Sequence, residues 1–413
     1  MSLTSAPASW TEAQLQQFRQ TGDPPADQMI AQVFAHHGVA AVNQVLTHFL
    51  DNSNDNAPVS QLPPEAAQFL TTTAALPAWA DHNKLAIAEA LFLEQGPLIF
   101  LALTCASLPE CYINGNEAEV LGVTNRLKGR RAFRRIIETA QLIVDVLAQG
   151  AFTSQTGSGT VAAQRVRILH AGMRHLIGKA KSFQASPSED PLWTQLAAAT
   201  HDAAAVPINQ VPINQEQLAY TLCTFSYVIL RSLAILKVEI ADNQCDAYVH
   251  SWAVAGHLLG VQDELIPLDF AQAQALFDRL KLDQFRATKE GCALAASLRT
   301  FMSELLGFPW VGSQPATFLM RTLLDERTAT ALGIGRLSLL DRLVALLLRL
   351  TVWNVEQLQK DVGRTDLRPL LQWTEERVID GLSAMPLAWQ GRLFAIPPNL
   401  KSHWAMRRHN PNG

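Results

Sequence analysis

The chain has 413 residues, of which 48% are hydrophobic and 17% charged, and its formal net charge is −4. A chain of this length can bury a large core, and the low charged fraction indicates that much of it is buried. The nearly balanced charge, without a basic stripe interleaved with aromatic residues, argues against a nucleic-acid-binding protein.

Apolar residues recur at helical spacing along almost the whole chain, and alternating β-branched runs between tight turns are nearly absent. The pattern therefore predicts an all-α protein. In chain order, we expect helices over residues 26–51, 84–107, 130–149, 161–178, 215–236, 244–259, 270–280, 289–306, 315–324, 337–357 and 370–385.

Residues at the expected helix ends support several of these boundaries. Asn214, with Gln217 three residues later, is typical of a capping box at a helix start. Gly150, Gly178 and Gly260 are placed as helix stops. Between the helices, residues 51–64 and the Gly/Ser-rich residues 153–160 are expected to be loops, and the duplicated VPINQ of residues 206–215 an extended connector. No linker is long enough to separate two independent domains, so a single large helical unit is expected.

The two most apolar segments, residues 85–108 and 337–355, contain charged residues that are costly at a bilayer centre. We interpret both as buried helices and leave shallow membrane association open. The five cysteines are scattered without a CxxC or CxxCH motif, which argues against a zinc ribbon, a thioredoxin-type site and covalently attached haem. Together with the absence of a signal-like N-terminus, they predict reduced thiols in a cytoplasmic protein.

The stretch RVRILHAGMRH, residues 165–175, is the most informative part of the chain. It places His170 in an apolar helical pattern, with Arg167 one turn before and Arg174 one turn after it, so that all three can share a helix face. A haem needs a neutral imidazole on its iron and cations near its propionates. Spacing alone favours the alternative, an ordinary core histidine flanked by solvated arginines.

The expected helix 130–149 has a polar face formed by Arg135, Glu138 and Thr139. One interpretation is a surface ion pair between Arg135 and Glu138. The other is a polar patch inside a pocket, where Glu138 acts as a base or faces an iron. Just before this helix, Glu117 and Glu119 point apart on a helix, so that one can face inward while the other is solvated.

The remaining histidines give weaker signals. His250 and His257 lie seven residues apart, roughly 10 Å along a helix, which is too far for both to bind one metal ion. We interpret them as structural. His36 and His37 are interpreted as solvated or capping residues.

Several blocks, in this order, resemble the family of haem oxygenases that contains bacterial latex clearing protein (rubber oxygenase) and the fungal ER-bound oxygenase of mycophenolate biosynthesis. The resemblance covers roughly residues 76–404. The blocks are LPAWAD (76–81), SLPECY (107–112), RRIIET (134–139), RVRILHAGMRH (165–175), VPINQ (211–215), TFS (224–226), GHLLGV (256–261) with His250 before it, and LFAIP (393–397).

The resemblance implies an all-α fold with a globin-like core that holds a non-covalent haem b. It implies His170 as the proximal iron ligand, with Arg167 and Arg174 beside the haem or its propionates. Family histidines that match His175 and His250 are taken as structural, as is the one that matches His257.

The resemblance also implies a polar cluster of Arg135, Thr139 and Glu119 that includes a candidate general base. Two departures separate the chain from latex clearing protein. That protein has a lysine on the distal side of the iron, where this sequence has Glu138. In addition, no export signal is seen, whereas rubber is a polymer outside the cell.

The resulting hypothesis is an intracellular haem b oxygenase that uses O₂ to oxidise an apolar, isoprenoid-like small molecule or to cleave its C=C bond. Glu119 or Glu138 would assist proton removal. We expect residues 1–75 to form an N-terminal helical extension, residues 76–404 the catalytic domain and residues 405–413 a tail. Two alternatives are a haem-binding sensor or carrier without turnover, and a helical lipid-binding protein that has lost haem.

Overall fold

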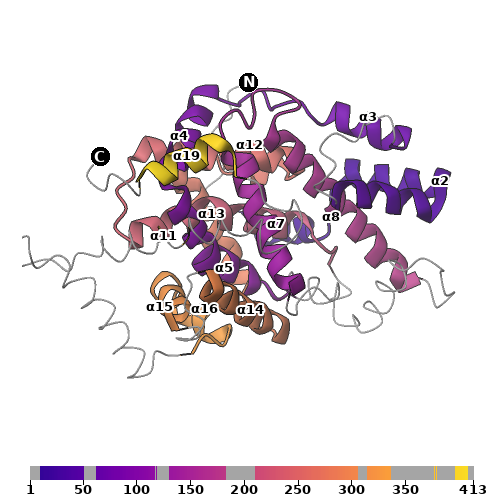
Figure 1. Ribbon diagram of the computed structural model, residues 1–413. Helices are drawn as coiled ribbons and strands as arrows, with labels where there is room; N and C mark the ends of the chain where they lie inside the picture. Colours follow the sequence, from indigo (N-terminus) through magenta and orange to yellow (C-terminus); the bar gives the residue numbers. More distant parts are fainter. Residues whose placement is uncertain are drawn as a thin grey trace, which may run out of the picture.

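The chain folds into a bundle of helices, as Figure 1 shows. The computed structural model describes residues 10–50, 62–116, 118, 130–182, 210–305, 314–335, 376, 378 and 396–407. Within these ranges, the β-structure is confined to one isolated bridge between Asn114 and Phe285. The prediction of an all-α protein is therefore confirmed.

The helices of the described residues follow in chain order. They are α1 (Glu12–Arg19), α2 (Pro24–Leu50), α3 (Pro64–Thr72), α4 (His82–Ala102), the π-helix η3 (Leu103–Ser107), α5 (Leu108–Tyr112), α7 (Arg130–Leu147), α8 (Ser158–Ser182), α10 (Gln215–Cys223), the π-helix η4 (Thr224–Val228), α11 (Ile229–Ile235), α12 (Asp242–Leu258), the 3₁₀-helix η5 (Asp263–Leu265), α13 (Phe270–Gln284), α14 (Lys289–Leu305), α15 (Gln314–Leu323), α16 (Glu326–Ala331) and α19 (Pro398–Arg407).

Two continuous helical rods form the centre of the fold. The first runs through α4, η3 and α5, and begins at Asp81, whose carboxylate accepts hydrogen bonds from the first-turn amides of Asn83 and Lys84. The second runs through α10, η4 and α11. The two π-helical turns contact each other, and α5 also contacts η4, where Cys111 Sγ lies 3.0 Å from Thr224 Oγ1.

Both rods are long and apolar enough to cross a membrane, over His82–Tyr112 and Gln215–Ile235. Most of each segment is buried inside the protein, which is also what the core helices of a globular fold show. The interpretation of residues 85–108 as a buried helix is thus confirmed. The second apolar segment, residues 337–355, lies outside the described residues.

Helix α8 lies between the main core and an outer layer. It packs against α7 and α12 on the side of the main core, and α2 covers it from the other side. Ile168 and Ala171 of α8 are fully buried in a small separate core that α2 and α3 complete. The helix that holds the RVRILHAGMRH block therefore lies between α2 and α3 on one side and α7 and α12 on the other.

Most expected boundaries agree with the structure within a few residues, and two helix ends are corrected. Gly150 and Gly260 have φ of +79° and +82° and follow helix ends, as expected of stops. Gly178 does not end α8, which begins at Ser158, inside the expected loop, and continues to Ser182. A glycine ends a helix only where the backbone enters the left-handed region, and Gly178 stays outside it.

The second VPINQ copy is a capped helix start and not only an extended connector. Asn214 Oδ1 accepts a hydrogen bond from the Gln217 amide at 3.0 Å, and the Gln217 side chain accepts one from the Asn214 amide at 3.1 Å. The predicted capping box is confirmed. The first copy is described only at Gln210, and the expected helices 337–357 and 370–385 fall almost wholly outside the described residues.

Candidate functional site

His170 occupies a buried position on α8 where its imidazole stays neutral. The Nδ1 atom is inaccessible and has no hydrogen-bond partner among the described residues. Burial, together with the positive charges of Arg174 and Arg135, lowers the pKa of His170 to about 3. The residue as a whole retains some accessible surface. A neutral imidazole with an unsatisfied nitrogen is the form in which histidine binds a metal.

Arg174 lies one helical turn after His170 and is only partly satisfied. Its Nε donates to Asp27 Oδ1 at 2.7 Å, and its Nη1 donates to the Ile213 carbonyl at 3.0 Å. The Nη2 atom is buried and has no partner among the residues that the structure describes. A buried guanidinium nitrogen without an acceptor can bind an anionic group such as a carboxylate.

Arg167, one turn before His170, is engaged differently. Its Nε and Nη2 donate to the two carboxylate oxygens of Asp23 at 2.6 and 2.9 Å. Its guanidinium also lies over the Phe69 ring, 5.3 Å from the centroid. The bidentate pair neutralises Arg167 inside the protein, so the two arginines that flank His170 differ in their free hydrogen-bonding capacity.

Two glycines make room for these ion pairs. A Cβ on Gly260 would collide with Asp23 Oδ2 and would lie 2.6 Å from Arg167 Nε. A Cβ on Gly22 would lie 3.0 Å from Arg174 Cδ. The close approach explains why the turns beside α8 contain residues without side chains.

Gln215 holds the same two turns together. Its Nε2 donates to the carbonyls of Gly22 and Gly260 at 2.7 and 2.9 Å, and its Oε1 accepts from the Gln262 amide at 2.8 Å. Gln215 is fully buried. The VPINQ, GHLLGV and RVRILHAGMRH blocks, distant in sequence, therefore meet around one hydrogen-bonded network beside His170.

Helix α7 brings Arg135 near His170, as the effect of its charge on the histidine pKa shows. Arg135, Glu138 and Thr139 are half-buried. The Thr139 hydroxyl donates to the Arg135 carbonyl at 3.0 Å, a bond within the helix. The polar face predicted for this helix is thus present beside α8, and the roles proposed for its side chains remain predictions.

Glu119, the other candidate base, and its neighbour Glu117 lie outside the described residues. The structure therefore brings together Arg135, His170 and Arg174 of the predicted site. It also places Arg167 on the same helix but in an ion pair. Sequence reasoning did not identify Asp23 or Gln215 as parts of this arrangement. Their hydrogen-bond partners are distant in the sequence, and the residues around Asp23 and Gln215 do not indicate them.

The histidines interpreted as structural have protein contacts that occupy them. His250 Nε2 accepts a hydrogen bond from the Asp81 amide at 2.9 Å, and burial lowers the His250 pKa to about 4. His257 Nδ1 lies 3.2 Å from Asp263 Oδ1. Both rings pack edge-on against Trp79, at 5.7 and 6.1 Å between centroids. These contacts account for both side chains without a metal.

Comparisons with known proteins identify relatives of this chain. Residues 101–356 match the family described as ER-bound oxygenase mpaB/B'/Rubber oxygenase, catalytic domain. Rubber oxygenase of Streptomyces sp. (strain K30) is 26% identical over 379 residues, which cover 91% of this chain and 84% of that protein. The solved structure of latex clearing protein LCP in the closed state matches with a TM-score of 0.66 and 26% identity, over 88% of this chain and 90% of that one.

The family match spans more than half of the chain and contains the His170 helix, α7 and Gln215. The chain belongs to this family of oxygenases, and it is an oxygenase enzyme. The resemblance inferred from the sequence blocks is confirmed.

Proposed function

We propose that the chain is a haem b-dependent oxygenase that uses O₂ to oxidise, or to cleave at a C=C bond, an apolar isoprenoid-like substrate. One observation carries the proposal. A buried, neutral imidazole with an unsatisfied nitrogen lies one turn from a buried guanidinium with an unsatisfied nitrogen, on one helix of an oxygenase fold. In native proteins, such buried polar atoms are normally paired.

The residues present fit a haem. His170 would hold the iron, because its low pKa leaves the imidazole unprotonated at any physiological pH. Arg174 would use its free Nη2 to bind a propionate carboxylate. Arg135 and Arg174 together repel a proton from the imidazole, which favours the form that binds iron. When bound, haem b supplies the redox chemistry with O₂ that side chains lack.

The other candidate residues have supporting roles in this proposal. Arg167, held by Asp23, would fix α8 against the start of α2 beside the cofactor. Glu138, half-buried on the face of α7 that includes Arg135, would accept a proton from the substrate, and Glu119 is the second candidate for that role. Thr139 would contribute to pocket polarity.

The substrate class is argued from the family. The name of the Streptomyces relative states that it acts on rubber, an apolar polymer. An apolar alkene is therefore the substrate class that we propose for this chain. All five cysteines are free thiols, which is typical of proteins in a reducing compartment. We therefore propose a cytoplasmic location.

The test has two stages. The ultraviolet–visible spectrum and a pyridine haemochrome assay of the purified protein are expected to show stoichiometric haem b, which His170→Ala removes and His82→Ala, a surface control, retains. O₂ consumption is then expected to rise on addition of an isoprenoid alkene. Haem without O₂ uptake on any isoprenoid alkene would contradict the proposed substrate class. The absence of haem, even after hemin is added, would overturn the proposal.

A further inference from the structure

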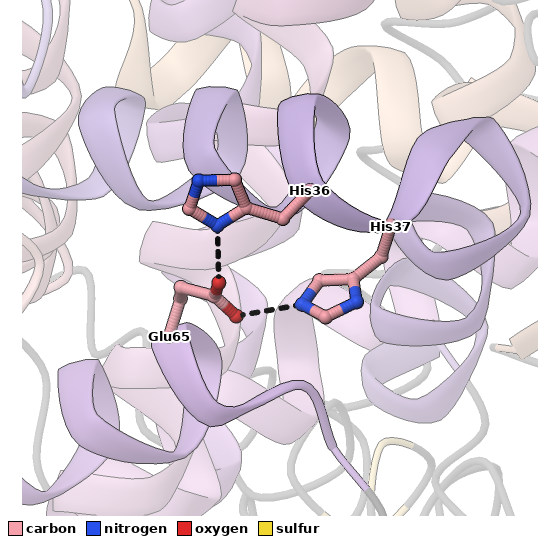
Figure 2. Close-up of side chains that lie close together, drawn as sticks. All are labelled: His36, His37 and Glu65. Atoms are coloured by element: carbon pink, nitrogen blue, oxygen red, sulfur yellow. Dashed lines mark hydrogen bonds and ion pairs between the residues drawn. The ribbon is translucent and has the colours of Figure 1, made fainter.

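Outside the His170 site, two imidazoles and one carboxylate converge on the surface between α2 and α3 (Figure 2). His36 Nδ1 lies 2.8 Å from Glu65 Oε1, and His37 Nε2 lies 3.2 Å from Glu65 Oε2. One potential ligand atom from each of the three residues lies within 4.8 Å of the other two. Both histidines are exposed, so the cluster is open to ions from solvent.

The two consecutive histidines that reach this carboxylate lie directly before a break in α2. Neighbouring side chains on a regular α-helix point away from each other. Helix α2 is interrupted directly after His37, where Gly38 adopts φ +77° and ψ −174°. Figure 2 shows the two rings approaching Glu65 from different sides, with His37 at the point where the helix turns away. A Cβ on Gly38 would contact nothing, so the glycine serves the backbone conformation and not a tight fit.

We propose that His36, His37 and Glu65 form a binding site for a divalent transition-metal ion, with Zn²⁺ as the best match. Two imidazoles and one carboxylate form a recognised zinc-binding set, with the fourth position left to water. Ligand atoms at about 2.0–2.1 Å from a tetrahedral ion lie about 3.3 Å from each other. Both observed distances to Glu65, 2.8 and 3.2 Å, are shorter than that value, so a small outward movement of the rings admits an ion.

The geometry of the cluster favours a metal ion over two separate ion pairs, because all three side chains already offer a ligand atom to the same point. Exposed pairs between a carboxylate and a histidine add little stability, whereas an ion that joins all three ligands replaces two weak contacts by three coordination bonds. None of the three residues takes part in the contacts around His170.

A bound ion would connect α3 to α2 at the point where α2 is broken. Helix α2 also packs along α8. Phe34, two residues before His36, contacts the His175 ring of α8, with 5.0 Å between the ring centroids. The metal would therefore stabilise the packing of α2 and α3, which cover the His170 helix. This is a structural role, separate from the oxygen chemistry.

The proposal is tested by isothermal titration calorimetry of ZnCl₂ into the full-length chain, freed of any affinity tag. We expect one Zn²⁺ per chain, binding at least about tenfold weaker in Glu65→Gln, and none in the double variant His36→Gln/His37→Gln. The controls are His82→Gln, which removes another exposed histidine, and His170→Ala, which removes the buried one. Both controls are expected to keep the binding of the parent.

A second measurement separates ligand loss from misfolding. Zn²⁺ is expected to raise the melting temperature of the parent and of both control variants, to raise that of Glu65→Gln by less, and to leave that of His36→Gln/His37→Gln unchanged. Gly38→Ala keeps all three ligands and disfavours the broken helix, and is expected to weaken Zn²⁺ binding while the circular dichroism stays helical. The proposal is overturned if the parent binds no Zn²⁺, or if Glu65→Gln and the double variant bind it as the parent does.

Discussion

The buried His170 and the exposed pair His36 and His37 are on helices that pack against each other, yet their surroundings are opposite. His170 has a pKa of about 3 and an Nδ1 atom without a partner among the described residues. The two surface histidines each contact a carboxylate oxygen of Glu65. The comparison shows two ways in which a protein prepares a histidine for a ligand. One is desolvation, which keeps the ring neutral, and the other is convergence on a charged oxygen.

Helix α2 connects the two regions. Asp23 lies at its start and Asp27 in its first turn, and they bind Arg167 and Arg174 of α8, while the surface cluster lies at its break. Changes at either region are therefore expected to affect how α2 is held, but only changes at His170 are expected to affect haem.

The largest expected effect comes from His170→Gly. Because this variant removes the proposed iron ligand, we expect haem affinity to fall by about a hundredfold or more, since loss of a residue that merely supports a metal ligand already costs roughly 10–100-fold. Added imidazole is expected to restore the haem spectrum, because it can occupy the space of the missing ring. The measurement is a hemin titration followed by absorbance, with and without imidazole.

The same titration on Glu65→Gln provides the contrast. That variant is expected to bind haem as the parent does, because the Glu65 carboxylate pairs with His36 and His37, which are not among the residues proposed to hold the haem. Unchanged haem affinity in His170→Gly would mean that another residue holds the iron.

The next largest effect concerns the two acids of α2. Asp23→Asn leaves the nearly buried Arg167 without its charged partner, and we expect it to lower the free energy of unfolding by about 3 kcal/mol. The side chain of Asp27 is 35% exposed, so Asp27→Asn is expected to cost only about 1 kcal/mol. Urea denaturation measures both. Equal losses would show that the burial of Asp23 does not set the strength of its ion pair.

Acidification is expected to affect the two regions in different pH ranges. The His170 pKa is about 3 in the folded protein and about 6.5 in the unfolded chain, so between these values the unfolded state binds more protons. Stability of the haem-free protein therefore falls as the pH falls from about 6.5, by up to about 1.4 kcal/mol per pH unit from this group. Glu65, whose pKa is lowered from 4.5, contributes stability that is lost only at more acidic pH.

Urea denaturation of the haem-free protein at about pH 7, 6 and 5 tests this difference. His170→Gln is expected to flatten the dependence on pH in that range, and Glu65→Gln to leave it unchanged. His250, whose pKa is also lowered by burial, remains in all variants and contributes equally to each. If His170→Gln kept the full slope, the histidine would be more accessible to water than its position indicates.

Local patterns predicted the fold and part of the site. Periodicity gave the helices, and the spacing of Arg167, His170 and Arg174 placed them on one helix. The family resemblance then selected His170 as a ligand, which spacing alone did not. The helix end expected at Gly178 was wrong, because a glycine permits a left-handed turn but does not require one.

Contacts between distant residues were not predictable from such patterns. Arg167 pairs with an acid 144 residues earlier and Arg174 with one 147 residues earlier. The residues next to each arginine in the sequence do not indicate which of the two will be neutralised. The structure alone shows that one is neutralised and the other keeps a free nitrogen. Likewise, His36 was interpreted as solvated or capping, because its partner Glu65 lies 29 residues away across a helix break that periodicity does not reveal.

The smallest expected effect tests Glu138, at which the family resemblance implies a lysine in latex clearing protein. Glu138→Lys on α7 replaces a half-buried carboxylate with an amine. If this position faces the iron, as the resemblance implies, the ferric spectrum shifts toward a nitrogen-ligated, six-coordinate form, while haem affinity changes little because His170 still holds the iron. Glu138→Gln is the matched control, since it removes the charge without adding an amine. An unchanged spectrum in Glu138→Lys would place this residue away from the iron, and Glu119 would then be the stronger candidate for the base.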